Sequence, residues 1–156
     1  MCTAITYQPR ELYMGRSLDY EASYGEELVV LPRRFPLRFR HGGGSEQGYA
    51  ILGTAHVAGG YPLYYNAVNE KGLGIAGLNF VGNARYAAPQ DGRQNVAQFE
   101  FIPWLLRQCA TLAEARQLLQ AVNLTGTPFS AHFPAAQLHW LLADTTGALT
   151  LEPTAA

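Results

Sequence analysis

A series of short β-prone runs separated by turn residues occupies the first half of this chain and most restricts its fold. The runs are CTAITYQ, YMGRSLDY, EELVVLP, YAILGTAHVA and the two parts of PLYYNAVNEKGLGIAGLNF. Proline ends the third run, and the glycine-rich HGGGSEQG directly precedes the fourth. NEKG forms a tight turn between the last two runs. Short strands joined by tight turns pair with their neighbours in sequence, so the pattern predicts an antiparallel meander.

Two helices and a closing hairpin are predicted next. NVAQFEFIPWLLRQCA, residues 95–110, has apolar side chains at helical spacing. TLAEARQLLQAV, residues 111–122, repeats that spacing, with Thr111 as N-cap and Glu114 three residues later. The loop LTGTPFSAHFPAAQ leads to LHWLLADTTGALTLEP, a hairpin with its turn at DTTG. This order predicts an α+β fold in which helices pack on an antiparallel sheet, as a single domain over residues 1–156.

The composition excludes several classes of protein. With 48% hydrophobic and 15% charged residues among 156, the chain is typical of a globular domain with a core. The net charge of −1 predicts no nucleic-acid partner, and the arginines of PRRFPLRFRH are interpreted as an exposed loop or edge. No apolar run is long enough to span a bilayer, and the start lacks a signal-peptide pattern, which predicts a cytoplasmic protein without a membrane partner.

Cys2 and Cys109 are the only cysteines, and their separation fits neither a disulfide framework nor a metal site, so no metal or other cofactor is expected. Cys2 stands directly behind the initiator methionine. Removal of that methionine would give one residue both a thiol nucleophile and a free α-amine, whose unperturbed pKa is about 7.7–8.0. The simpler alternative is a cysteine that begins a strand. The histidines show no recognisable spacing with Cys2, and core or loop roles suit them: His41, His56, His132 and His139.

Three polar residues could assist such a thiol. GRSLDY places Arg16 and Asp19 three residues apart, where a guanidinium could favour a thiolate and a carboxylate could orient an ammonium. The alternative is an exposed ion pair in a turn. Asn79 ends the glycine-rich strand GLGIAGLNF, where its amide could stabilise an oxyanion or simply cap the strand.

Taken together, the motifs resemble the choloylglycine hydrolases, which include bile salt hydrolases and penicillin V acylases. MCTAITY, GRSLDYEASYGEELVVLPR, NAVNEKGLGIAGLNF, NVAQFEFIPWLL and LHWLLAD occur in the family's order, so the resemblance extends from Cys2 to about Glu152. It implies an N-terminal nucleophile hydrolase with an αββα sandwich. The implied activity is hydrolysis of a linear carbon–nitrogen amide bond, foremost in glycine or taurine conjugates of bile acids.

The resemblance also implies catalytic roles. Met1 would be removed, and the Cys2 thiol would attack the substrate amide while its own amine serves as base and then protonates the leaving amine. Asp19 would hydrogen-bond that amine, and Arg16 would lie beside the thiol. The Asn79 side chain and a backbone N–H would receive the oxyanion, and water would then cleave the thioester.

Four residues fall where the family lines an apolar pocket: Tyr20, Tyr24, Ala58 in HVAGGYP and Phe133 in GTPFSAHFPAAQ. Aromatic and aliphatic walls suit a steroid acyl group, although each residue alone would also suit ordinary packing. Asparagine at position 79 resembles the bile salt hydrolase branch, because several penicillin V acylases carry tyrosine there.

The chain departs from the family in length. Family members are about twice as long and continue into a strand, a second catalytic asparagine and a further active-site arginine. The sequence is therefore interpreted as a truncated member that supplies the first half of the sandwich, with an apolar sheet face exposed to self-association. The alternatives are a penicillin V acylase-like amidase, and a non-catalytic homologue that binds an apolar acyl ligand or self-associates. A thiol redox or metal-binding module is disfavoured because no C-x-x-C or H-x-x-x-H spacing occurs.

Overall fold

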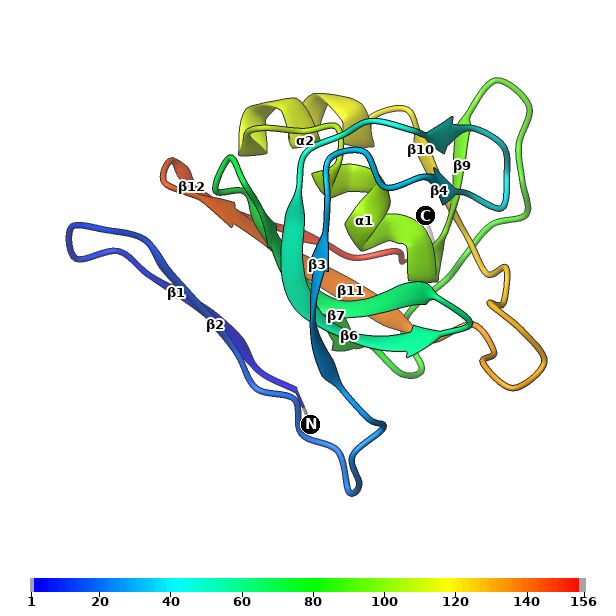
Figure 1. Cartoon of the computed structure of the whole chain (residues 1–156), viewed down its shortest axis with the longest axis horizontal. Helices are drawn as coiled ribbons and strands as arrows, with labels where there is room; N and C mark the ends of the chain where they lie inside the picture. Colours follow the sequence, from blue (N-terminus) through cyan, green and yellow to red (C-terminus); the bar gives the residue numbers. More distant parts are fainter. Residues whose placement is uncertain (1, 155–156) are drawn as a thin grey trace.

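The computed structural model describes residues 2–154, apart from the side chain of Ser45, and its principal element is a six-stranded antiparallel sheet (Figure 1). The strand order is β12-β11-β8-β7-β6-β3, and every neighbouring pair is antiparallel. The strands are β3 (Glu27–Leu31), β6 (Ile51–Ala58), β7 (Tyr61–Asn69), β8 (Gly74–Asn79), β11 (Leu138–Asp144) and β12 (Gly147–Leu151). The predicted pairing of neighbouring runs is thus confirmed from β3 through β6 and β7 to β8, as is the closing hairpin. The first two runs depart from the predicted meander, because they pair only with each other in a separate two-stranded sheet.

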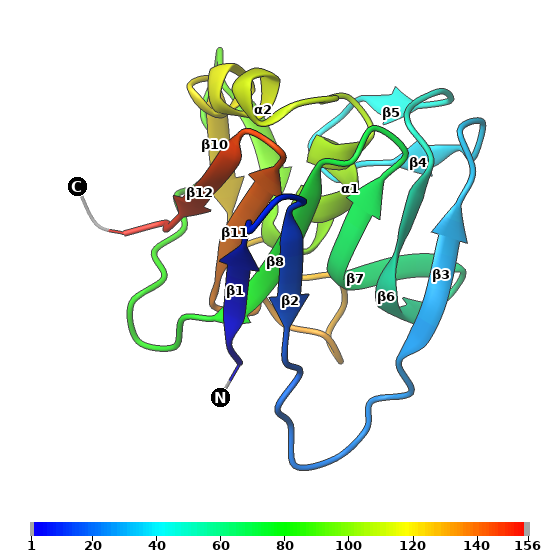
Figure 2. The same ribbon diagram turned by 90° about the vertical axis from the view of Figure 1, so that its left-hand side faces the viewer.

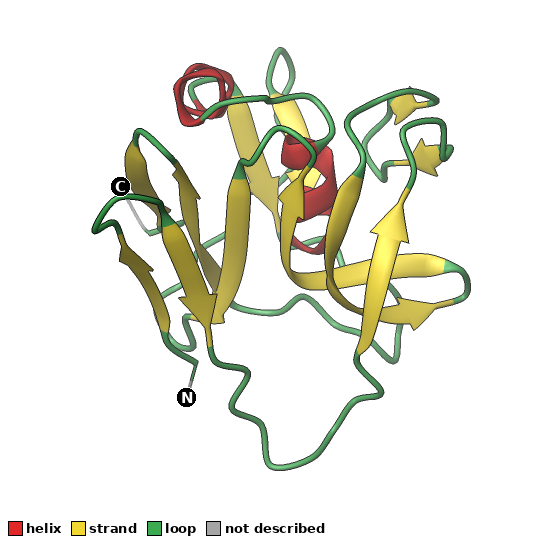
Figure 3. Ribbon diagram, turned by 60° about the vertical axis from the view of Figure 1, so that its left-hand side comes forward, coloured by secondary structure: helices red, strands yellow, loops and turns green. Residues whose placement is uncertain are grey.

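A separate hairpin and a pair of helices lie on opposite faces of this sheet (Figures 1 and 3). The hairpin consists of β1 (Ala4–Tyr7) and β2 (Tyr13–Arg16). On the other face lie the 3-10 turn η1 (Gln98–Glu100), α1 (Phe101–Leu106) and α2 (Leu112–Leu119). The main core fills the space between the sheet and α1, where the rings of Phe101 and Trp140 are 4.7 Å apart and both residues are fully buried. The layers are therefore hairpin, sheet and helices.

The first predicted helix begins later than expected, and this corrects the boundary at residue 95. Residues Gln94–Ala97 form the strand β9, which pairs in parallel with β10 (Val122–Thr125). That pairing joins segments on either side of both helices, so no local pattern could reveal it. Helical structure starts at Gln98, and Pro103 stands at the third position of α1, in the first turn, where a missing N–H leaves no helical hydrogen bond unmade.

The second predicted helix starts as its sequence indicates. Thr111 caps α2, because its hydroxyl accepts a hydrogen bond from the Glu114 N–H at 3.2 Å. The Glu114 carboxylate in turn accepts from the Ala110 N–H at 2.6 Å. A second carboxylate, Asp144 at the end of β11, accepts from the Leu112 N–H at 2.6 Å. The start of α2 is thus fixed both locally and to the sheet.

A short hairpin lies beside these helices. It is formed by β4 (Leu37–Arg38) and β5 (Gly44–Ser45), which pair antiparallel. This segment lies within and just after the arginine-rich run PRRFPLRFRH. Leu37 is buried in the main core, whereas Arg38 is exposed, so the run alternates between core and surface.

The face of the sheet that carries the β1–β2 hairpin is only partly covered (Figure 2). The pairing register places Val30, Leu52 and Val68 in one row across β3, β6 and β7. Their exposed fractions are 64, 43 and 40%, and Leu28 is 76% exposed. A cavity of about 270 Å³ on this face is lined by Met14 of β2 and by Leu28, Leu52 and Val68 of the sheet. The chain therefore carries the exposed apolar sheet face that its sequence led us to expect.

Candidate active site

Arg16 connects the Cys2 thiol to the central sheet. Cys2 is half-buried just before β1, and Arg16 ends the neighbouring strand β2. Nη2 of Arg16 lies 3.6 Å from the Cys2 Sγ and donates a 3.0 Å hydrogen bond to the Gly77 carbonyl in β8. The guanidinium also lies over the Tyr65 ring, 5.8 Å from its centroid. Its Nε and Nη1 are buried and have no hydrogen-bond partner among the described residues. These donors could bind an acceptor that enters the site.

Asp19 is joined to the residue after Cys2 through Ser17. The Ser17 hydroxyl accepts from the Thr3 N–H at 3.1 Å and donates to Asp19 Oδ2 at 3.0 Å. The backbone N–H of Ser17 also donates to the Thr3 carbonyl at 2.9 Å. Asp19 is itself exposed. Ser17 was not among the residues selected from the sequence, because its role depends on the antiparallel pairing that brings Thr3 beside it.

Asn79 is the last residue of β8 and lies opposite Leu138 of β11. Its side chain is exposed at the strand end. Gly77, whose carbonyl accepts from Arg16, stands two residues earlier in the same strand. The structure therefore attaches Cys2 and Arg16 to the terminal part of the strand that Asn79 ends.

Tyr20 and Tyr24 form an aromatic group in the loop between β2 and β3. Their rings are 5.1 Å apart in an edge-to-face arrangement, and the Tyr65 ring lies 6.4 Å from Tyr20. Burial raises the pKa of Tyr20, the charge of Cys2 raises it further, and Arg16 opposes both. A cavity of about 470 Å³ adjoins this group, lined by Asp19, Tyr20, Glu21 and Tyr24.

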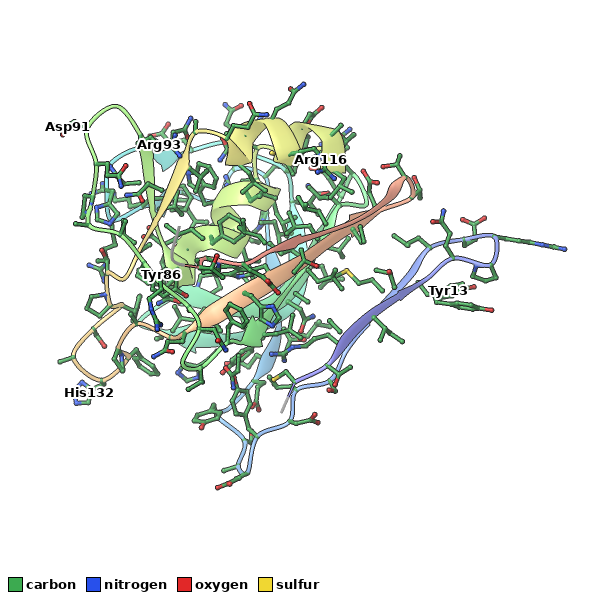
Figure 4. All side chains as sticks on the ribbon, turned by 180° about the vertical axis from the view of Figure 1, so that it is seen from behind. Tyr13, Tyr86, Asp91, Arg93, Arg116 and His132 are labelled. Atoms are coloured by element: carbon green, nitrogen blue, oxygen red, sulfur yellow. The ribbon has the colours of Figure 1, made fainter. Side chains whose placement is uncertain are left out.

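Phe133 and Ala58 belong to a second group at the end of the β6–β7 hairpin. Ala58 ends β6 opposite Tyr61. Phe133 lies in the loop between β10 and β11, which His132 marks in Figure 4, and its ring is 5.4 Å from His56 and 6.0 Å from Phe129. Phe129, in the segment interpreted as a loop, and His56, interpreted as a core or loop histidine, thus contact Phe133, although neither was among our candidate residues.

The described part of the chain shows neither a metal-binding cluster nor a membrane-spanning helix. Within residues 2–154, no group of three histidine, cysteine, aspartate or glutamate side chains is arranged to hold a metal ion. No helix in the same range has the length and apolar character needed to cross a membrane. The expected removal of Met1 concerns a residue outside the described range.

Solved structures share this arrangement. Two crystal structures of conjugated bile acid hydrolase variants from Clostridium perfringens superpose with TM-scores of 0.91 and 0.88 at 29% sequence identity. The matches cover 99% and 98% of this chain and 48% of each of those chains. Penicillin V acylase from Agrobacterium tumefaciens has the same fold, with a TM-score of 0.72 at 20% identity. The chain therefore has about half of the N-terminal nucleophile hydrolase fold, as the expectation of an incomplete sandwich requires.

Sequence relatives define the family more closely. The pattern of the linear amide C–N hydrolases, choloylglycine hydrolase family, matches residues 2–156. A bile salt hydrolase/transferase from Lactiplantibacillus plantarum is 46% identical over 152 residues, which are 97% of this chain and 47% of the relative. A conjugated bile acid hydrolase from Lactobacillus gasseri is 35% identical over 155 residues, 97% of this chain and 49% of the relative. The chain belongs to the choloylglycine hydrolase family, and it spans about half the length of these curated relatives.

Proposed function

We propose that this protein hydrolyses a linear amide bond in glycine- or taurine-conjugated bile salts, with the Cys2 thiol as nucleophile. The observation that carries the proposal is the position of Arg16, which bridges the Cys2 sulfur and the β8 carbonyl of Gly77. Asn79 ends that same strand. The names of the relatives, bile salt hydrolase and conjugated bile acid hydrolase, support this substrate class. We regard the chain as one domain, the N-terminal portion of a choloylglycine hydrolase-like domain.

The proposed reaction begins once Cys2 carries a free α-amine. That amine takes the thiol proton, and sulfur attacks the amide carbon to form a tetrahedral oxyanion. The Asn79 amide and a backbone N–H stabilise the oxyanion. The protonated amine, oriented by Asp19, then donates its proton to the leaving nitrogen as the carbon–nitrogen bond breaks. Water hydrolyses the resulting thioester, which releases the acid and restores the thiol.

The two clusters of aromatic residues described above are suited to bind the acyl part of the substrate. We propose that Tyr20 and Tyr24 form one wall of an apolar pocket, and that Ala58 and Phe133 form the other. The exposure of three of these side chains supports the assignment, because their apolar area is available to a ligand. The exposed fractions are 36% for Tyr20, 56% for Tyr24 and 38% for Phe133. A small residue at position 58 leaves room for a bulky ring system.

The test compares the purified protein with Cys2→Ala. Both are incubated with glyco- and tauro-conjugated bile salts and with penicillin V, and the released amine or acid is measured. We expect release from the bile conjugates by the wild type alone. Equal signals from both proteins would refute catalysis by Cys2, and preference for penicillin V would reassign the substrate. Intact mass measurement gives an independent check, because retained Met1 would block the α-amine.

A second candidate is a non-catalytic role in which the chain associates with itself. The exposed row of Val30, Leu52 and Val68 supports it, since uncovered apolar faces of this kind favour association. We therefore propose a homo-oligomer. We also propose a cytoplasmic location, where a thiol nucleophile remains reduced.

A further inference from the structure

We propose that Arg40 is a positioning residue for the acyl pocket, because it holds the loop that carries Phe133. The inference rests on the proposed function only in assigning Phe133 to that pocket. The contacts of Arg40 stand independently of it. They join the turn after β4 to the loop between β10 and β11, which are distant in sequence.

Arg40 holds Phe129 in two ways. Its Nη2 donates a hydrogen bond to the Phe129 carbonyl, so it fixes the backbone of the loop. Its guanidinium also lies 5.6 Å from the centroid of the Phe129 ring and 5.7 Å from that of Phe99. The Phe99 and Phe129 rings meet edge to face at 5.3 Å. A planar guanidinium is suited to this combination of ring stacking and hydrogen bonding, which a lysine could not reproduce.

Phe129 in turn fixes Phe133. The Phe129 N–H donates to the Phe133 carbonyl at 3.1 Å, and the Phe133 N–H donates to the Ser130 carbonyl at 3.2 Å. The two phenylalanine rings are 6.0 Å apart. These bonds close a tight turn, so a displacement of Phe129 must also move the Phe133 ring.

Arg40 is itself held by a buried acid. The backbone N–H of Arg40 donates to Glu100 Oε1 at 2.8 Å, and Glu100 is only 1% exposed. The following residue, His41, reaches the same loop from its other end. Its Nε2 lies 2.8 Å from the Thr125 hydroxyl and 2.9 Å from the Thr127 hydroxyl. Arg40 and His41 therefore attach both the start of the loop and its Phe129 turn to the segment that follows β4.

The loop needs such a support because residues 126–137 contain no helix or strand. Segments without regular hydrogen bonding open locally at low free energy. A pocket wall made from such a segment selects among acyl groups only if its side chains are held in place. Arg40 would therefore influence substrate affinity more than the chemical step.

The test uses Arg40→Ala and Arg40→Met, with Arg38→Ala as the matched control. Arg38 is the exposed arginine of the adjoining strand β4. Amide hydrogen exchange is measured for residues 126–134, with and without glycocholate. We expect exchange there to be about three- to tenfold faster in both Arg40 variants and unchanged in the control. In the active enzyme, KM for bile conjugates should rise about three- to tenfold while kcat changes less than about twofold.

The outcomes separate this inference from the proposed function. Equal loop exchange in Arg40→Ala and Arg38→Ala would overturn the inference, whether or not the protein hydrolyses amides. Faster exchange with an unchanged KM would also overturn it, as would loss of cooperative unfolding in both Arg40 variants. In another outcome, glycocholate protects the loop from exchange in the wild type, and not in the Arg40 variants, while the wild type hydrolyses no amide. That result would support the positioning role of Arg40 and refute the proposed hydrolytic activity. If glycocholate protects the loop in no protein and no amide is cleaved, the loop is not an acyl pocket.

Discussion

The two cysteines of this chain occupy opposite environments. Cys109 is 3% exposed, and burial, followed by the charge of Glu114, raises the pKa of its thiol to about 11. Cys2 is half-buried beside the Arg16 guanidinium. We predict that brief iodoacetamide treatment at neutral pH alkylates Cys2 at least about tenfold faster than Cys109, because a buried thiol reacts slowly. Peptide mapping measures both sites, and equal labelling would contradict the prediction.

At Asn79, catalysis and stability should respond differently to the same substitution. Asn79→Ala should lower kcat by about 10²–10³ with little change in KM, because an oxyanion donor acts only while charge is present on the oxygen. Its exposed position predicts a stability change within about 0.5 kcal/mol. Asn83→Ala, in the loop after β8, is the control and should keep normal turnover. An Asn79 variant that unfolds would instead show a structural role.

Glu100 should make stability depend on pH. Burial raises the pKa of its carboxyl from 4.5 to about 7, against the lowering effect of hydrogen bonds from the Arg40 and Ala97 N–H groups. The folded state therefore binds this proton more tightly than the unfolded state does. The stabilisation that protonated Glu100 contributes is complete below about pH 4.5 and is lost as pH rises through 7. The free energy of unfolding should fall by at most about 3 kcal/mol over this range.

The measurement for Glu100 is the free energy of unfolding in urea between pH 4.5 and 8. Glu100→Gln, which stays neutral, should have a smaller loss of stability over this range than the wild type. Glu11→Gln, at an exposed position, should follow the wild type. A Glu100→Gln curve parallel to that of the wild type would refute the assignment.

At the scale of elements, the β7–β8 turn holds the carboxyl end of α1. Asn69 is buried, and its Nδ2 donates to the Leu106 and Cys109 carbonyls at 2.8 and 2.7 Å. Its Oδ1 accepts from the Lys71 and Leu73 N–H groups, each at 3.1 Å. One side chain thus satisfies the helix end and shapes the turn. Helix carbonyls without such partners carry a desolvation cost.

We therefore predict that Asn69→Ala lowers the free energy of unfolding by about 2–4 kcal/mol, because it leaves buried polar groups unpaired. Gln108→Ala provides the comparison, since Gln108 makes a 2.8 Å bond to the Trp104 carbonyl of the same helix but at the surface. Its loss should cost less than about 1 kcal/mol. Urea unfolding of both variants decides the matter, and similar losses would show that burial of Asn69 is unimportant.

For the whole molecule, the uncovered face of β3, β6 and β7 should control association. We predict that the wild type forms particles heavier than the 17.1 kDa chain and that Leu52→Lys shifts them toward the monomer. Leu52 lies at the centre of the exposed row, where a charge opposes burial. Val81→Lys, at a 73% exposed position outside the row, should associate like the wild type. Sedimentation velocity at several concentrations tests this, and a monomeric wild type would contradict it.

Local sequence determined the elements whose signals lie within one segment. The strands of the meander follow β-prone runs and glycine turns, and the start of α2 follows Thr111 and Glu114, because each depends on contacts between near neighbours. The ordered motifs also identified the family, which the match to the family pattern and the sequence relatives confirmed. The catalytic and pocket roles assigned by resemblance stay predictions.

Only the tertiary structure decided which distant segments meet. The β9–β10 pair, the bond from Arg16 to Gly77 and the bond from Arg40 to Phe129 join residues 28, 61 and 89 positions apart. No periodicity or cap specifies such pairs, since each forms only after the sheet brings its segments together. Ser17 illustrates the same limit, because its hydroxyl gains a role when antiparallel pairing places Thr3 beside it. Local propensity thus selected most of the elements, with β9 as an exception inside a segment of helical spacing, while burial of the shared core determined their contacts.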